Sequence, residues 1–425
     1  MITMLTVGKK YEVEIVDLDF NGNGVAKIEE DVIFVTDALK NEKGLIEITK
    51  KGKNSYFGKM IKRTIDSPDR VSEKSNLGSL DLSHLSFERQ LVWQKELTEG
   101  TLKRALKQDV KVLDTLTDNN PFNYRNKVVF HVLEDEFLQL GLYTTEPVKL
   151  VKVDNFILAN KIVNEILTKI NKAKIKVDPF KLKHVVFKNN SQNQLVVTLV
   201  STNKNFLGKD ELISLLETFK QVIGITINIK PNDKVILGHK SYEVSGTSEL
   251  KEDELYITDK SFLQVNLPVM KMTYDVISKN ITGKKIIDAY CGVGSIGFYL
   301  YKKNPNLTID MIDNQVDNIL LANKTKREND YKSVNIIKDN SEDAVEGLSA
   351  DTLVLDPPRQ GLMPKLVDTI LDKKFKEIIY LSCDLKTLTR DLRLLTSTYE
   401  IKTIQPIKMF PQTTSLETLV VLKLK

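Results

Sequence analysis

Residues 288–297 read Asp-Ala-Tyr-Cys-Gly-Val-Gly-Ser-Ile-Gly, and they join the apolar, strand-like run at residues 284–290 to a helical pattern. Glycines in such a loop permit a tight turn and a close approach of the backbone to a ligand. Further strand-like runs alternate with helical patterns, at residues 307–312, 334–338, 352–355 and 377–381. This alternation predicts an α/β fold with a doubly wound parallel sheet, whose ligand site lies at the carboxyl ends of its strands.

The glycine loop fits two classes of ligand. Gly292, Gly294 and Gly297 have the Gly-x-Gly-x-x-Gly spacing of dinucleotide-binding folds. Asp288 precedes this loop, where a carboxylate would repel a pyrophosphate but can accept hydrogen bonds from the amino group of S-adenosylmethionine. Asp313 ends the second predicted strand, where a carboxylate accepts the ribose hydroxyls of either ligand. We therefore favour a methyl donor over a nicotinamide cofactor.

Cys383 is one of two cysteines in the chain and stands between the apolar run at residues 378–382 and the helical pattern at residues 384–388. A thiol beside the amino terminus of a helix has a lowered pKa and is partly thiolate at neutral pH. The other interpretation is a buried cysteine that acts as a small hydrophobic residue. The segment alone leaves both interpretations open.

Two further motifs place acidic residues at strand ends. Residues 355–361, Leu-Asp-Pro-Pro-Arg-Gln-Gly, end the fourth predicted strand, and the consecutive prolines fix an extended exit that points Asp356 into the ligand site. Glu417 enters the apolar last strand, where burial would raise its pKa toward the range useful to a base. A solvated glutamate at a strand end is the alternative for Glu417.

The composition indicates a globular, cytoplasmic protein of two or three domains. The 425 residues include 62 Lys and Arg against 57 acidic residues, and the net charge of +5 permits nucleic-acid binding without requiring it. Two cysteines do not suffice for a disulfide framework or a four-thiolate metal site. We expect no membrane segment, because no uncharged apolar run is long enough, and no secretory signal.

Residues 1–66 are predicted to form a small β-barrel, because short strands alternate with turns there. A basic stretch in this region suits RNA phosphates and stacked bases, or else forms a solvated strand edge protected by lysines. The stretch consists of Lys50, Lys51, Lys53, Lys59, Lys62 and Arg63, with Tyr56 and Phe57 among them. Residues 67–258 predict a central α+β domain, with helices at residues 87–107, near 156–171 and at 209–221.

Five segments, in their order and spacing, resemble the RNA uracil-5 methyltransferases of the RumA/TrmA type. They are residues 262–266 (Phe-Leu-Gln-Val-Asn), 288–294, 356–361, 382–384 (Ser-Cys-Asp) and 410–417. Residues 8–63 resemble the TRAM barrel that precedes many members of this family, and residues 124–127 resemble a segment near the target RNA. The resemblance implies a methyltransferase domain at residues 259–425, preceded by an RNA-binding barrel and an RNA-binding central domain.

By this resemblance the chain is an S-adenosylmethionine-dependent RNA (uracil-C5-)-methyltransferase. Cys383 would add to C6 of the target uracil, because C5 is a poor nucleophile until that addition turns the ring into an enolate. Glu417 would then remove the C5 proton. The family implies cofactor-binding roles for Gln264, Tyr290, Ser295, Asp313, Asn340 and Asp356, and substrate-binding roles for Phe262, Arg125 and Arg359.

The chain departs from the family pattern at several positions. Asp313 replaces the commoner Glu, and Ser415 stands where His is frequent. Many members hold a four-cysteine iron–sulfur cluster, whereas Leu77, Leu80 and Phe156 occupy positions that resemble three of its ligands. We therefore expect no iron–sulfur cluster, with apolar packing in its structural place.

Structured RNA is the expected partner of a monomeric enzyme. We expect 23S ribosomal RNA, because the amino-terminal barrel is typical of members that act on the large-subunit RNA. The alternatives are a transfer RNA uridine C5 methyltransferase, an RNA cytosine C5 methyltransferase and a non-catalytic RNA-binding factor. Cytosine enzymes normally carry a second cysteine in the fourth-strand motif, and residues 356–361 contain none. An amino-group methyltransferase would leave Cys383 and Glu417 unexplained.

Overall fold

The computed structural model describes residues 5–232 and 234–425. Contacts within the chain divide it into two compact units, Met1–Gly100 with Phe410–Ser415, and Thr101–Met409 with Leu416–Lys425. The domain limits predicted at residues 66 and 258 remain a prediction. No helix within the described residues combines the length and the apolar character needed to cross a membrane.

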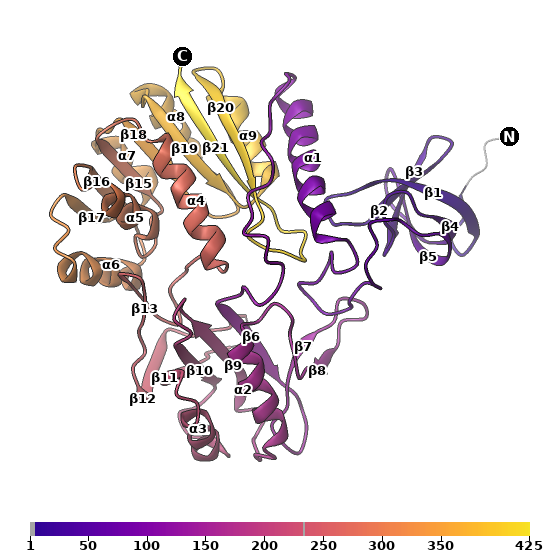
Figure 1. Cartoon of the computed structure of the whole chain (residues 1–425), viewed down its shortest axis with the longest axis horizontal. Helices are drawn as coiled ribbons and strands as arrows, with labels where there is room; N and C mark the ends of the chain where they lie inside the picture. The colour runs from indigo at the N-terminus through magenta and orange to yellow at the C-terminus, as the bar shows by residue number, and fades with distance from the viewer. Residues whose placement is uncertain (1–4, 233) are drawn as a thin grey trace. The chain divides into compact units, whose positions relative to one another are not determined.

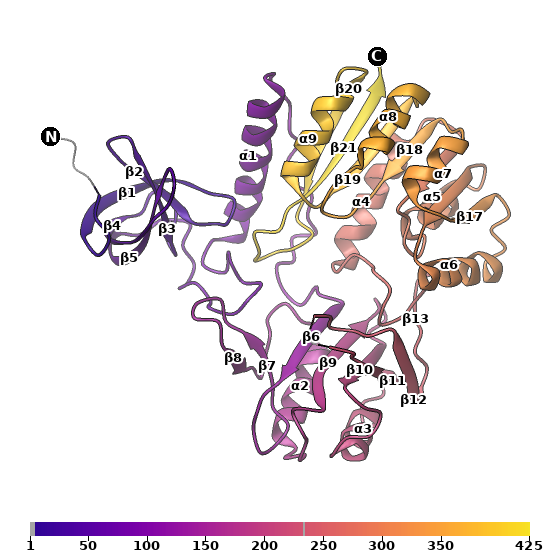
Figure 2. The same cartoon turned by 180° about the vertical axis from the view of Figure 1, so that it is seen from behind.

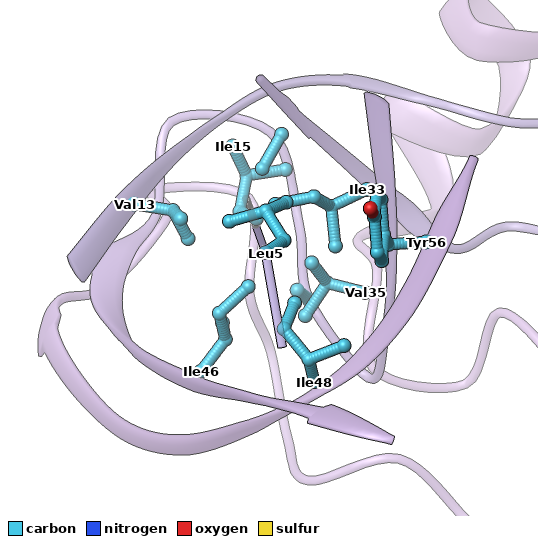
Figure 3. Close-up of a cluster of buried hydrophobic side chains, with 10 residues drawn as sticks. Leu5, Val13, Ile15, Ile33, Val35, Ile46, Ile48 and Tyr56 are labelled. Carbon is cyan, nitrogen blue, oxygen red and sulfur yellow. The ribbon is translucent and has the colours of Figure 1, made fainter. Parts of the chain in front are cut away.

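Five short strands of the first unit close into a barrel. They are β1 (Lys10–Leu18), β2 (Gly24–Ile28), β3 (Asp31–Thr36), β4 (Lys43–Lys51) and β5 (Tyr56–Ile65). Alternate side chains of a strand point to opposite faces, and the inward apolar ones fill the interior (Figure 3). The labelled core side chains are Leu5, Val13, Ile15, Ile33, Val35, Ile46, Ile48 and Tyr56. The predicted β-barrel is therefore confirmed.

The basic stretch of the barrel follows the end of β4, the turn after it and β5. Its five lysines are exposed. Tyr56, however, lies in the barrel core at 5% exposure, while Phe57 remains 37% exposed. Arg63 forms ion pairs with Asp66 and Glu73. Of the aromatic residues in this stretch, Phe57 and not Tyr56 is therefore available for stacking on a base.

A seven-stranded sheet occupies the middle of the chain, in the order β12-β11-β10-β9-β6-β7-β8. Its strands are β6 (Lys127–Val132), β7 (Leu140–Tyr143), β8 (Leu150–Lys152), β9 (Leu182–Asn189), β10 (Leu195–Ser201), β11 (Val222–Ile229) and β12 (Lys240–Gly246). The helices of this region are α1 (Phe87–Leu106), α2 (Lys161–Lys172) and α3 (Lys209–Glu217). Helix α2 begins later than predicted because Asn160 caps it by accepting the Ile162 N–H.

A second seven-stranded sheet follows, in the order β17-β16-β15-β18-β19-β21-β20, drawn orange to yellow in Figures 1 and 2. Its strands are β15 (Lys285–Ala289), β16 (Thr308–Asp313), β17 (Val334–Lys338), β18 (Thr352–Leu355), β19 (Glu377–Ser382), β20 (Tyr399–Ile407) and β21 (Glu417–Leu424). The hairpin β13 (Leu250–Glu252) and β14 (Leu255–Ile257) precedes it. The helices are α4 (Leu267–Asn280), α5 (Ser295–Lys303), α6 (Val316–Glu328), α7 (Ser341–Gly347), α8 (Pro364–Lys373) and α9 (Leu385–Leu395).

Strands β15 to β19 are parallel, and β21 runs antiparallel to both β19 and β20. The predicted doubly wound α/β fold is therefore confirmed. The strand order reverses at β15, which pairs with β16 on one side and with β18 on the other. The carboxyl ends of strands at such a reversal are the usual ligand site. Gly292 follows β15, Asp356 follows β18 and Cys383 follows β19, so the fold gathers these three motifs along one edge of the sheet.

Candidate active site

The loop after β15 is held in a conformation that leaves its backbone open to a ligand. Tyr290, Gly292 and Gly294 have positive φ angles of 62°, 58° and 86°. A Cβ added to Gly292 would meet no atom within 4 Å. Asp313 braces the turn, because its Oδ2 accepts the Gly292 N–H at 3.0 Å and its Oδ1 accepts the Gln315 N–H at 2.8 Å. The close approach that a ligand needs is therefore possible at Gly292.

Asp288 lies at the end of β15 and is fully buried. Its Oδ2 accepts the Gly297 N–H at 2.9 Å, which ties the strand to the first turn of α5. Its Oδ1 is buried and has no hydrogen-bond partner in the described part of the chain. Burial, together with the nearby Asp356 and Asp313, raises the pKa of Asp288 to about 7. The carboxyl group therefore keeps one oxygen unused by the fold.

Three other predicted cofactor positions lie around the same loop. The Tyr290 N–H donates to Ser341 Oγ at 3.1 Å, which brings the start of α7 next to the loop. Asn340, the residue before Ser341, is exposed. The Ser295 hydroxyl lies 2.9 Å from the hydroxyl of Tyr274, which is buried in α4. The fold thus brings Tyr290, Ser295 and Asn340 to one end of β15.

Asp356 and Gln264 meet although they are far apart in the sequence. Gln264 is 4% exposed, and its side chain donates a hydrogen bond to the Asp356 carboxylate. Burial raises the pKa of Asp356 to about 7, and this hydrogen bond opposes the shift. Gln264 stands just before Asn266, which caps α4 by accepting the Val269 N–H. The cap fixes the direction of the segment that delivers Gln264 to Asp356.

The loop that continues from Asp356 is clamped by α9. Asp391 is fully buried and accepts the Leu362 N–H at 2.9 Å. Arg390 donates to the carbonyls of Gln360 and Leu362 at 2.9 and 3.0 Å. Gly361 has a φ of +73°, and a Cβ there would lie 2.6 Å from Asp391 Oδ2. Only glycine therefore fits this turn.

Cys383 is followed at once by the amino-terminal cap of α9. The Asp384 carboxylate accepts the N–H groups of Lys386 and Thr387, both at 2.9 Å. Thr387 Oγ1 in turn donates to the Arg359 carbonyl at 3.1 Å, which links the start of α9 to the loop after β18. The predicted position of Cys383, at a strand end before a helix, is therefore confirmed.

The predicted pKa of Cys383 is wrong in its direction. The pKa of this half-buried thiol is raised to about 11, and burial is the largest cause. The carboxyl groups of Glu417 and Asp356 add to the rise, and the guanidinium of Arg359 opposes it. The helix terminus would favour a thiolate, but desolvation and two neighbouring acids outweigh it.

Glu417 begins β21 and is 2% exposed. Its neighbour Thr418 pairs with Ser382, the last residue of β19, so Glu417 lies beside the strand end that carries the thiol. Burial raises the pKa of Glu417 well above its ordinary value, Asp356 raises it further, and Arg359 lowers it. The predicted rise in the pKa of Glu417 is confirmed, and the interpretation of a solvated glutamate is excluded by its burial.

Phe262 and Arg125 stand apart from this cluster. Phe262 is 65% exposed. The Arg125 guanidinium lies 6.0 Å from the centre of the Phe156 ring, and the Arg125 backbone forms a bridge to Asn266. The roles of both residues toward a substrate stay predictions.

Sequence reasoning did not single out Tyr274 or Asp391. Burial raises the pKa of Tyr274 above its ordinary range, and the acids Asp356 and Asp288 add to the shift, which places the phenol close to the site. No pattern in the sequence marks this tyrosine. Asp391 had a signal, because it is an acidic residue one position before Leu392 on the buried face of the amphipathic helix α9.

The residues around the glycine loop fit an adenosyl methyl donor. The open space at Gly292 lets a ligand approach the backbone, and the unused Asp288 Oδ1 and the Asp313 carboxylate supply hydrogen-bond acceptors for an amino group and for ribose hydroxyls. Carboxylates on both sides of the loop are unfavourable neighbours for a pyrophosphate.

Two family models match the chain. The model of the tRNA (uracil-5-)-methyltransferases matches residues 86–425, and the model of the TRAM domain matches residues 5–61. Similar curated proteins include an uncharacterized RNA methyltransferase of Listeria innocua, which is 32% identical over 100% of this chain and 99% of the relative. Another, from Clostridium acetobutylicum, is 31% identical over 97% of this chain and 96% of the relative.

One solved structure shares the fold over almost the whole length. The Pyrococcus abyssi tRNA (uracil-54, C5)-methyltransferase in complex with S-adenosyl-L-homocysteine superposes with a TM-score of 0.75 at 22% identity, over 97% of this chain and 100% of that chain. The five motifs, the architecture and the family models agree with one another. The chain therefore belongs to the tRNA (uracil-5-)-methyltransferase family and is an RNA uracil-C5 methyltransferase that uses S-adenosylmethionine.

Proposed function

We propose that the chain methylates its target uridine through a covalent intermediate, with Cys383 as the nucleophile and Glu417 as the base. The observation that carries the proposal is the pairing of Ser382 with Thr418, which places Cys383 and Glu417 next to paired residues of neighbouring strands, and Glu417 also raises the pKa of Cys383. They come from the carboxyl end of β19 and the start of β21. A nucleophile and a base at one strand edge are what addition and elimination at neighbouring ring atoms require.

The residues act in three steps. Attack of the Cys383 sulfur on C6 forms the S–C6 bond and moves the C5=C6 electron pair into an enolate, which makes C5 nucleophilic. Bound S-adenosylmethionine supplies the electrophilic methyl group that C5 receives. Glu417 then accepts the C5 proton, and the electron pair of the broken C–H bond restores the C5=C6 bond and expels the Cys383 sulfur as a thiolate.

The electrostatics of the site set the condition for each step. A thiol with a pKa of about 11 must lose its proton before it attacks, and Arg359 is the cation that lowers this pKa. A carboxylate with a raised pKa is a stronger base than an ordinary glutamate, which suits Glu417 for removing a proton from carbon.

We propose that the methyl donor binds to the cofactor-binding residues that the resemblance implies. They are Gln264, Tyr290, Ser295, Asp313, Asn340 and Asp356, with Phe262, Arg125 and Arg359 on the side of the RNA. Contacts that support this grouping are the Gln264–Asp356 hydrogen bond and the bond from Gly292 to Asp313. We also propose that the protein holds no iron–sulfur cluster, because a four-thiolate cluster needs more than the two cysteines in the chain.

For the RNA we propose 23S ribosomal RNA, with transfer RNA as the second candidate. The exposed lysines of the barrel support RNA binding through phosphates, which does not depend on sequence. Transfer RNA is the second candidate because the Pyrococcus abyssi tRNA methyltransferase matches 97% of this chain, and a match of that length includes the barrel. A barrel therefore does not by itself separate the two kinds of RNA.

The test uses RNA that carries 5-fluorouridine, whose C5–F bond blocks the elimination step. The full chain and S-adenosylmethionine are incubated with large-subunit ribosomal RNA and with transfer RNA. We expect a methylated covalent adduct on ribosomal RNA that survives denaturation and is absent with Cys383→Ala. An adduct on transfer RNA alone would replace the proposed substrate with the second candidate.

Two other outcomes would contradict the mechanism. No adduct on either RNA would remove Cys383 as a nucleophile toward uracil. Methyl transfer to cytosine in unmodified RNA, measured by nucleoside mass spectrometry, would favour the cytosine C5 methyltransferase instead.

A further inference from the structure

Two lysines of the central sheet hold the short loop at residues 258–261, just before Phe262. Lys127 in β6 and Lys188 in β9 are cross-strand partners. Lys188 Nζ donates to the first and last carbonyls of this loop, those of Thr258 and Ser261, at 2.6 and 2.7 Å. Lys127 Nζ donates to the carbonyl between them, that of Asp259, at 2.7 Å. Three carbonyls of one loop are therefore held by a single pair of lysines.

Lys188 is a buried hydrogen-bond donor. It is 1% exposed, and burial lowers its pKa well below the ordinary value, as does the neighbouring Lys127, while Asp259 opposes the shift. The Lys188 Nζ donates to two carbonyls and the Lys127 Nζ to a third, so each of the two opposed lysines has acceptors of its own.

A separate anchor holds the chain just beyond Phe262. Asn126 Nδ2 donates to the Gln264 carbonyl at 2.9 Å, and the Asn126 N–H donates to the Val265 carbonyl at 3.0 Å. Residues 262–263 thus span two fixed points, and Phe262 is 65% exposed between them. A large apolar side chain that is exposed at a fixed position can pack against a bound ligand.

We infer that Lys188 is a positioning residue, which fixes the 258–261 loop so that the exposed Phe262 is presented to the target base. The inference rests on the proposed function, in which Phe262 meets the flipped uridine. Gln264 keeps its own anchor in Asn126, so loss of Lys188 loosens the loop before Phe262, which Lys127 and Ser241 still contact, without releasing Gln264. Loss of Lys188 should therefore slow the reaction with the target base and leave the affinity for the methyl donor unchanged.

The test measures two quantities in the full-length Lys188→Met variant. Met keeps the length of the side chain and removes both donors. We expect the single-turnover rate of adduct formation with 5-fluorouridine RNA to fall about tenfold or more, and the Kd for S-adenosylhomocysteine by calorimetry to change less than about twofold. All rates are taken well below the melting temperature of each variant. Lys127→Met, which removes one donor, should give a smaller loss of rate.

A matched control and a double variant separate positioning from general stability. Lys183 lies on the same strand with its Nζ 5.5 Å from the centre of the Phe180 ring, and Lys183→Met should leave both quantities unchanged. If Lys188 acts through Phe262, the double variant Lys188→Met, Phe262→Ala should be no slower than Phe262→Ala alone.

The inference is overturned if Lys188→Met forms the adduct within twofold of the wild-type rate. It is also overturned if the fold-loss in rate of the double variant equals the product of the fold-losses of Lys188→Met and Phe262→Ala. Absence of an adduct in the wild-type protein is a different result, because it contradicts the proposed function itself and this inference with it.

Discussion

Cys291 and Cys383 occupy similar places in the same sheet, each just after a parallel strand and before a helix. Cys291 is 7% exposed, whereas Cys383 is half-buried. Burial raises the pKa of both thiols, and acidic neighbours raise both further. Only Cys383 has a cation, Arg359, that opposes the rise in its pKa. A strand-end position is therefore not enough to make a thiol reactive, because access and the surrounding charges decide it.

The loops near these two cysteines also differ in how tightly the surrounding residues hold them. The Cys291 loop leaves Gly292 open with no atom within 4 Å of a Cβ position, which suits a small ligand. The loop after β18, which Thr387 ties to the start of α9, is clamped by Asp391 and Arg390 of α9. The loop after one strand is thus open at a glycine, whereas the loop after the other strand is held rigidly by α9.

The largest difference between the two cysteines should appear in turnover. We expect Cys383→Ala to lower methylation by at least about 10³-fold, because a covalent step has no substitute. Cys291→Ala should keep activity within about twofold, since its thiol is inert in the proposed mechanism. Methyl incorporation into RNA measures both. Equal losses in the two variants would show that both thiols matter only through packing.

Glu417→Gln should affect a later step than Cys383→Ala does. We expect turnover to fall about 10²-fold or more, because general bases contribute about that much. A covalent complex with unmodified RNA should accumulate and release slowly, since the C5 proton stays in place. Denaturing gel electrophoresis detects the complex. Normal turnover in this variant would remove Glu417 as the base.

The rate of alkylation by iodoacetamide should rise with pH at Cys383 only. Below a pKa of about 11 the thiolate fraction grows about tenfold per pH unit, so the rate should increase about 100-fold between pH 7 and pH 9. Cys291 should remain unmodified in the folded protein because it is buried. Mass spectrometry of peptides distinguishes the two sites. A rate at Cys383 that is already maximal at pH 7 would contradict the raised pKa.

Removing the positive charge of Arg359 should give the smallest effect of the four. It should make Cys383 less reactive and so more similar to Cys291. Arg359 lowers the pKa of Cys383 and of Glu417. Arg359→Met should therefore raise both pKa values and slow alkylation of Cys383 about two- to fivefold at pH 8, as expected for one partly exposed charge. Faster alkylation in this variant would mean that Arg359 shields the thiol and does not activate it.

Much of the site could be predicted because its signals are local. Cys383 and Asp384 lie where an apolar strand pattern changes to a helical one, and Pro357 with Pro358 marks a strand exit. Contacts between distant segments had no such signal. The Gln264–Asp356 hydrogen bond and the clamp of Lys188 on the 258–261 loop join elements that the sequence does not connect.

The sequence by itself determined the α/β fold, the family and the order of its motifs, because strand and helix periods and strand-end glycines, prolines and acids act over a few residues. Only the tertiary structure decided that Tyr56 is a core residue and that the Cys383 thiol has a raised pKa. Burial and electrostatic potential are sums over groups brought together from the whole fold. They oppose the local preference of a helix terminus for a thiolate, and here they are stronger.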